Sequence, residues 1–239
     1  MSYDKTVASH YAHGDLLNAI ESAFSALGKT IDNVTIEDLA PVDEFHIGGR
    51  QATEHLLGQL HLSPHSHVLD IGCGLGGASR YVATHFSSRV TGIDLTDEYI
   101  QTGKALCAWL GLDRQVTLEK ASALSMPFGN SMFDVGFMLH VGMNIDNKAL
   151  LFKEVLRVMK PGACLGIYDI MREKDGELAY PVPWAENSDT CKLATLEEYQ
   201  QALVDAGFVV SKMENRRDFA VNFFQRLAIR ASENKGAHL

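Results

Sequence analysis

The chain has 239 residues, 46% of them hydrophobic, and a formal net charge of −9. This length can bury one substantial core with a small appended segment but hardly two full domains. The negative charge disfavours nucleic acid as a partner, because a surface that neutralises phosphates needs many Lys and Arg side chains. The N-terminus has no signal-peptide pattern and no apolar run approaches the roughly 18 residues of a membrane span, so we expect no membrane partner and a cytoplasmic protein.

The first 66 residues predict a helical cap and lead-in. Apolar residues at helical spacing predict a helix over 15–27. Thr35 begins a short helix that ends near Pro41, and a third helix covers about 50–60. We expect the apolar stripe of the first helix to lie over the mouth of a pocket, with Tyr11 facing inward; the stripe consists of Leu16, Ile20 and Phe24.

Residues 67–239 alternate between apolar runs and amphipathic helices, which predicts a parallel sheet covered on both faces. The final stretch, 218–231, is more helical than extended, so a seventh strand is not evident. The predicted strands are 67–71, 89–93, 116–120, 133–139, 163–170 and 208–214, and the predicted helices are 77–85, 97–110, 146–159 and 195–206.

A glycine-rich turn follows the first of these strands and predicts a ligand site on bare main chain. Gly72, Gly74 and Gly76 lack the Cβ atoms that would keep a ligand away, and they allow positive φ angles. The same glycines satisfy G-x-G-x-x-G, so an NAD(P)-binding oxidoreductase is an alternative. Asp70 argues against it, because its carboxylate would repel a pyrophosphate and attract a cation.

The second strand ends in an acid 20 residues after Gly74. A carboxylate at this place can accept hydrogen bonds from both hydroxyls of a ribose. Asp94 therefore predicts ribose binding, although it could also cap the following helix.

The pattern D-x-G-x-G-x-G at Asp70 resembles motif I of the class I S-adenosylmethionine (SAM)-dependent methyltransferases. The segment 121–128 resembles their G-D-A-x-x-L-P-F, with Ser122 in place of the aspartate that binds adenine, and 156–162 resembles their L-R-x-L-K-P-G. Phe45-His46-Ile47-Gly48-Gly49 resembles the H-x-G-Y/W segment of small-molecule enzymes, including sarcosine/dimethylglycine and phosphoethanolamine N-methyltransferases and natural-product methyltransferases.

The resemblance implies a Rossmann-like, doubly wound, mostly parallel α/β fold with an N-terminal helical cap. It implies methyl transfer from SAM to N, O or C of a small-molecule acceptor, with S-adenosylhomocysteine (SAH) as product. We expect the loop 171–194 to close over the acceptor. A non-catalytic SAM-binding regulator is a further alternative, and the acceptor and the oligomeric state stay open.

The resemblance also implies which residues contact the cofactor. Arg50 could pair with the SAM carboxylate or simply begin its helix with an exposed side chain. The predicted cofactor-binding residues are Asp70, Gly72, Cys73, Gly74, Gly76, Asp94, Leu95, Ser122, Ala123, Met138 and Arg50.

His140, at the end of the fourth strand, is the first candidate for a general base, with a pKa near neutrality; it could instead be a structural pocket residue. Tyr11 is the second catalytic candidate. No metal site is predicted, because the histidine-rich stretch 61–67 contains Ser and Pro, as surface loops do. The predicted substrate contacts are His46, Asn144, Asp169 and Trp184.

Overall fold

A computed structural model describes residues 3–12, 14–174 and 176–236 of the protein. Its centre is a sheet of five parallel strands in the order β3-β2-β1-β4-β5. Since the order reverses beside β1, the sheet is doubly wound, as expected. The strands are β1 (His67–Ile71), β2 (Arg89–Asp94), β3 (Val116–Lys120), β4 (Phe133–Leu139) and β5 (Met159–Tyr168).

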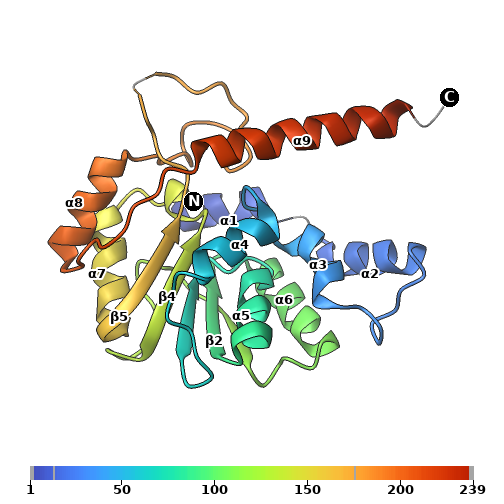
Figure 1. Ribbon diagram of the computed structural model, residues 1–239, viewed down its shortest axis with the longest axis horizontal. Helices are drawn as coiled ribbons and strands as arrows, with labels where there is room; N and C mark the ends of the chain where they lie inside the picture. Colours follow the sequence, from blue (N-terminus) through green and yellow to red (C-terminus); the bar gives the residue numbers. More distant parts are fainter. Residues whose placement is uncertain (1–2, 13, 175, 237–239) are drawn as a thin grey trace.

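Helices cover both faces of the sheet (Figure 1). Successive strand residues point to opposite faces, so Val68 packs among side chains of one helical layer and Leu69 among those of the other. Both faces are apolar, which explains why the strands are nearly continuous hydrophobic runs. The first layer contains α4 (Gly49–Leu57), α5 (Gly77–Phe86) and α6 (Asp97–Trp109), and the second contains α7 (Lys148–Val158) and α8 (Leu196–Ala206).

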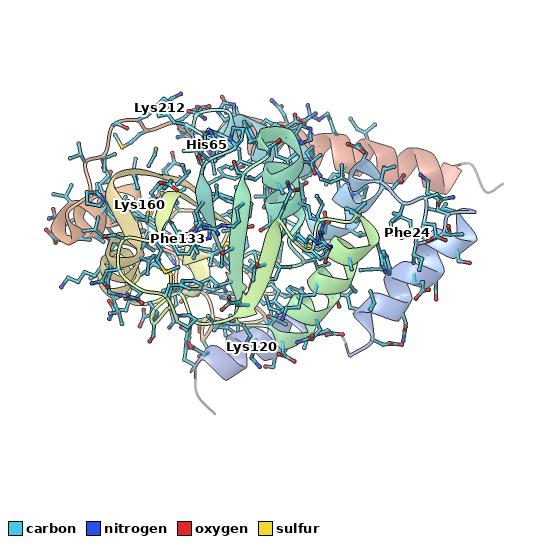
Figure 2. All side chains as sticks on the ribbon, turned by 90° about the horizontal axis from the view of Figure 1, so that it is seen from below. Phe24, His65, Lys120, Phe133, Lys160 and Lys212 are labelled. Atoms are coloured by element: carbon cyan, nitrogen blue, oxygen red, sulfur yellow. The ribbon has the colours of Figure 1, made fainter. Side chains whose placement is uncertain are left out.

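The N-terminal helices form two separate contacts with this core. α2 (Leu16–Ala26) buries Ile20 and Phe24 in an apolar cluster with Leu39, which belongs to α3 (Ile36–Asp43), and with Leu106 of α6. Figure 2 shows Phe24 at the outer end of the molecule, away from Phe133 in the sheet. The predicted position of the α2 stripe over a pocket mouth is therefore wrong: that place is taken by α1 (Tyr3–Tyr11).

The predicted strand at 208–214 is wrong, because this segment has no secondary structure. Val209 is 91% exposed, and no described strand pairs with the outer edge of β5. A β-branched sequence forms a strand only where a neighbour completes the hydrogen-bond ladder. β5 also begins earlier than predicted, because its first residue, Met159, pairs with Phe133 of β4. The register then shifts before the next pair, Val135 with Cys164.

The segment after 214 leads to α9 (Arg217–Gly236), which runs across the carboxyl ends of the strands and continues towards the side of the molecule where α2 lies (Figure 1). Phe219 holds its first turn against α4, since a Cβ on Gly48 would lie 2.4 Å from the Phe219 ring. Within the described residues, no helix is both long enough and apolar enough to cross a membrane.

Candidate functional site

A cavity of about 1250 Å³ lies at the carboxyl ends of the strands. Its walls come from the loops after β1, β2, β3 and β4, from α1, from residues 43–47, from the segment that includes Pro183 and Trp184, and from α9. Ligand sites of single small molecules commonly measure about 300–1,000 Å³. This cavity can therefore hold two ligands side by side.

The glycine turn forms the floor of the cavity at the end of β1. Gly72 and Gly74 both have positive φ angles, 71° and 54°. A Cβ on Gly74 would have no heavy atom within 4 Å, so only open cavity lies beyond its main chain. Cys73 lies between them, is buried and also lines the cavity. A flat ligand can lie directly against this backbone.

Two carboxylates face the cavity beside the turn. Asp70 accepts a hydrogen bond from Ser79 Oγ at 2.6 Å, and burial raises the pKa of its carboxyl to about 7. Asp94 accepts from the main-chain N–H of Gly74 at 3.0 Å and of Thr96 at 2.8 Å. Burial raises its pKa even so. A cation or a pair of hydroxyls would offset the cost of keeping these groups charged.

The alternative role of Asp94 as helix cap does not hold, because α6 begins at Asp97 with Thr96 as its N-cap residue. Asp94 instead holds the glycine turn and the β2 exit together. Leu95, Ser122 and Ala123, which were predicted to contact the cofactor, line the same cavity.

Four predicted contacts lie outside the cavity lining. Met138 is 1% exposed and packs towards α7, because strand alternation turns it away from the side to which Leu139 points. Gly76 begins α5, where a Cβ would lie 3.0 Å from Leu118, so its smallness serves packing. The other two are Arg50 and Asp169.

Arg50 faces α5. Its guanidinium lies 2.7 Å from Glu44 Oε1 and 4.6 Å from the centre of the Tyr81 ring. Asp169 accepts a hydrogen bond from Tyr199 Oη at 2.7 Å, and burial raises its pKa to about 6. Both side chains are therefore engaged by other protein groups, and neither lies where it could make the ligand contact predicted for it.

His140 reaches the cavity from the end of β4. Its backbone has φ 56°, a left-handed conformation held by a hydrogen bond from its N–H to Tyr168 O at 2.8 Å. Its ring lies 6.0 Å from that of His46, centre to centre. Burial, and then His46, lower the pKa of His140 to about 3. The expected pKa near neutrality is therefore wrong: the imidazole is neutral at physiological pH and can accept a proton.

His46 also lines the cavity, but its Nε2 is occupied. It lies 3.0 Å from Gly49 O and 3.0 Å from Thr53 Oγ1. Burial lowers its pKa to about 4. His46 therefore supports the loop before α4 and presents a neutral ring to the cavity.

Asn144 joins three segments that cover the cavity. It lies in the short 3-10 helix η1 (Gly142–Asn144), and its Oδ1 accepts from Tyr11 Oη at 3.0 Å. Its Nδ2 donates to Trp184 O and to Thr190 O, each at 2.9 Å. Tyr3 Oη donates to its main-chain oxygen at 2.7 Å. We name Tyr3, Tyr11, Asn144, Trp184 and Thr190 the cover network.

The cover network changes the interpretation of two residues that the sequence predicts to act in the site. The Tyr11 hydroxyl donates a hydrogen bond to Asn144 Oδ1. Burial together with nearby acids keeps the pKa of Tyr11 above the usual range, so the hydroxyl stays protonated and cannot act as a base. Trp184 lines the cavity and directs its Nε1 to Cys191 Sγ at 3.3 Å. Both residues lie where they were expected, with their polar atoms bound to protein.

The sequence interpretation missed the apolar wall opposite the glycine turn. Tyr3, Val7 and Tyr11 share one face of α1, and their i, i+4 spacing was the available signal. Phe223, Phe224 and Leu227 of α9 complete this wall. Among the described residues, no group of three or more His, Cys, Asp or Glu side chains is arranged to hold a metal ion.

Comparison with known proteins identifies the fold. Residues 68–162 match the family model described as a methyltransferase domain. Phosphoethanolamine N-methyltransferase 1 of Arabidopsis thaliana is 32% identical over 193 residues, which are 79% of this chain and 38% of the relative. The chain thus spans little more than a third of that relative's length.

Two solved structures share the fold at low sequence identity. Geranyl diphosphate C-methyltransferase from Streptomyces coelicolor A3(2), in complex with Mg²⁺, geranyl diphosphate and SAH, superposes with a TM-score of 0.68 at 21% identity and covers 89% of this chain and 81% of its own. The (4+2)-cyclase SpnF gives 0.63 at 21% identity, covering 84% and 71%. We conclude that residues 68–162 are similar to the methyltransferase domain family and that the chain has the class I methyltransferase fold.

Proposed function

We propose that this protein is a SAM-dependent methyltransferase that moves a methyl group to N, O or C of a small molecule and releases SAH. The observation that carries the proposal is a Cβ-free glycine turn flanked by two carboxylates, Asp70 and Asp94, in a cavity with room for two ligands. The family match of residues 68–162 and the SAH bound to the Streptomyces coelicolor relative support it.

The residues of the cavity floor fit SAM by their chemistry. Asp70 would attract the ammonium group, and Asp94 would accept from the ribose hydroxyls. The main chain at Gly74 leaves the space that the ligand needs, whereas Gly72 is small because a Cβ there would meet the Val141 side chain. Ser122 and Ala123 would border the adenine, where a serine hydroxyl can accept one hydrogen bond. Arg50, Gly76, Met138 and Asp169 have no place in this assignment, because they lie outside the cavity lining.

Bound SAM supplies an activated methyl group on sulfur, so the protein has to align the acceptor and exclude water. Alignment in a near-attack geometry can contribute roughly 7–11 kcal/mol. The cover network closes the cavity above the acceptor position. His140 lines the cavity at the end of β4 and would take the proton that leaves a hydroxyl or amine nucleophile.

We also propose that residues 1–66 act as a cap on the domain of residues 67–239. α1 supplies part of the cavity wall, and residues 43–47 supply another part. The end of the cap merges with the core, since a Cβ on Gly166 of β5 would lie within 3.3 Å of Leu56 and Leu60.

The test is calorimetric titration with SAM, SAH and NADH, followed by measurement of SAH formation with a metabolite panel. We expect SAM and SAH to bind and NADH not to bind. Binding of NADH in place of SAH would establish the oxidoreductase alternative. Binding of SAH without turnover of any acceptor would favour the non-catalytic regulator.

A further inference from the structure

The described residues that line the cavity include no cationic side chain. None of the described lining residues is Lys or Arg, whereas Asp4 and Asp146 add carboxylates at its mouth. Cations packed behind the lining are already engaged: Arg80 donates to Asp43, Arg50 lies against Glu44, and Lys148 donates to Ile145 O and Lys192 O. An anionic acceptor would find no opposite charge here.

Among the described residues, most of the neutral hydrogen-bond donors of the wall are also engaged, although the Tyr99 hydroxyl is not. The hydroxyls of Tyr3 and Tyr11, the amide of Asn144 and the indole N–H of Trp184 all donate to protein atoms. Turning any of them to a phosphate or carboxylate would break the cover network. Burying an anion without an opposite charge costs several kcal/mol or more, so such acceptors are strongly disfavoured.

Among the described lining residues, His10, Tyr99 and His140 have ring nitrogens or a hydroxyl with no hydrogen-bond partner. Of these, His140 comes directly before Val141, which packs against Gly72 of the glycine turn. Within the described part of the chain, no hydrogen bond reaches the ring nitrogens of His140, which line the cavity. Around it the wall is apolar, with Val7, Met143, Ile170, Phe223 and Phe224.

We propose that the acceptor is a largely apolar molecule without phosphate or carboxylate, whose hydroxyl or amine hydrogen-bonds to His140. This inference rests on the proposed function. In the reaction the S–CH₃ bond breaks with its electron pair left on sulfur, an O–CH₃ or N–CH₃ bond forms, and the proton passes to His140. The acceptor class excludes phosphoethanolamine and geranyl diphosphate, the anionic compounds in the names of two similar proteins, and resembles cycloartenol, in the name of another.

The experiment uses four ligands with one apolar body: geraniol, geranylamine, geranic acid and geranyl monophosphate. Each is titrated into the full-length protein saturated with SAH. We expect geraniol or geranylamine to bind at least about tenfold more tightly than either anion. The inference is overturned if an anion binds as tightly as the better of these two, or if neither of them binds. Failure of SAH itself to bind would instead reject the proposed function.

A matched pair of variants tests whether charge in the wall decides the preference. Phe224 lines the cavity and is 48% exposed, while Val221, one turn earlier on α9, is 45% exposed and lies outside the lining. Phe224→Arg should raise affinity for geranyl monophosphate at least about tenfold and leave SAH binding unchanged, and Val221→Arg should change neither. Equal effects of the two substitutions, or no effect of Phe224→Arg, would contradict the role of wall charge.

Discussion

The carboxylate of Asp94 has two roles. It accepts hydrogen bonds from the main-chain N–H groups of Gly74 and Thr96, and it faces the cavity, where a ligand can reach it. Asp94→Ala should weaken SAH binding roughly ten- to a hundredfold, since bonds to charged groups contribute about 1.5–3 kcal/mol each. Calorimetry measures the change. Asp97→Ala is the control, because Asp97 is 59% exposed and lies outside the lining. Unchanged affinity in Asp94→Ala would reject the ribose assignment.

Asp70 should make cofactor affinity depend on pH. Its folded pKa of about 7 lies above the ordinary value of 3.8, so the unliganded protein holds a proton there at mildly acidic pH. An ammonium ligand favours the charged carboxylate, so SAH affinity should rise with pH up to about 7, by at most about tenfold per unit. Titrations at several pH values measure this slope, and Asp70→Asn should flatten it. An equal slope in the variant would assign the effect to another group.

The same raised pKa has a consequence for folding. Between about 4 and 7 the native state binds more protons at Asp70 than the unfolded chain, so this group's contribution to the free energy of unfolding decreases as pH rises through that window. SAH binding, which favours the charged form, opposes that loss.

His140 should show no titration near neutrality. Because its pKa is lowered to about 3, the basic form predominates throughout pH 5–8, and log(kcat/KM) should have no limb from this residue there. His140→Ala should lower kcat about a hundredfold or more without loss of SAH affinity. Stopped assays of SAH formation over this pH range test both points. A fall in log(kcat/KM) below about pH 6.5 that disappears in the variant would show that burial does not lower the pKa of His140.

At the scale of elements, α1, η1 and the 180–191 segment depend on Asn144 for their mutual position. Asn144→Ala should loosen both covering segments, so that hydrogen exchange accelerates in residues 3–11 and 180–191. Turnover should fall at least about tenfold, because water exclusion and alignment are lost, while SAH affinity stays within about threefold.

Asn187→Ala is the matched control for the cover network. Asn187 lies in the same segment, is exposed and accepts one local bond from the Asp189 N–H. It should leave exchange and turnover unchanged. If the control behaves like Asn144→Ala, the segment responds to any substitution and the network has no special role.

At the scale of the whole molecule, the two halves of the N-terminal cap differ in what they stabilise. A chain beginning at residue 12 loses only α1, with its buried Val7, and should keep SAH binding while losing acceptor turnover and a small part of its thermal stability. A chain beginning at Pro41 also loses Ile20 and Phe24, whose burial stabilises by about 1.5–3 kcal/mol each. Its melting temperature should fall, which calorimetric melting would detect. Equal stability of the two truncated chains would show that the α2 cluster is dispensable.

Much of the local structure follows from sequence alone. The helices from α5 to α8 differ from their predicted ranges by no more than two residues at either end, and the capping box of Thr195 and Glu198 begins α8 as expected. The first four strands also agree. These features depend on side-chain periodicity, capping and glycine conformation within a few residues, so a linear pattern contains them.

The sequence by itself determined the fold class, the glycine turn and the two carboxylates beside it, because strand, turn and helix follow one another in the chain. Tertiary structure decided which polar atoms remain free for a ligand. Arg50 turns to Glu44, Tyr11 to Asn144 and Asp169 to Tyr199, each pairing with a residue that no local pattern could name. The lowered pKa of His140 and the lack of cations on the acceptor wall have the same origin. Burial and charge depend on which distant segments pack together, and that is set only when the chain closes around its core.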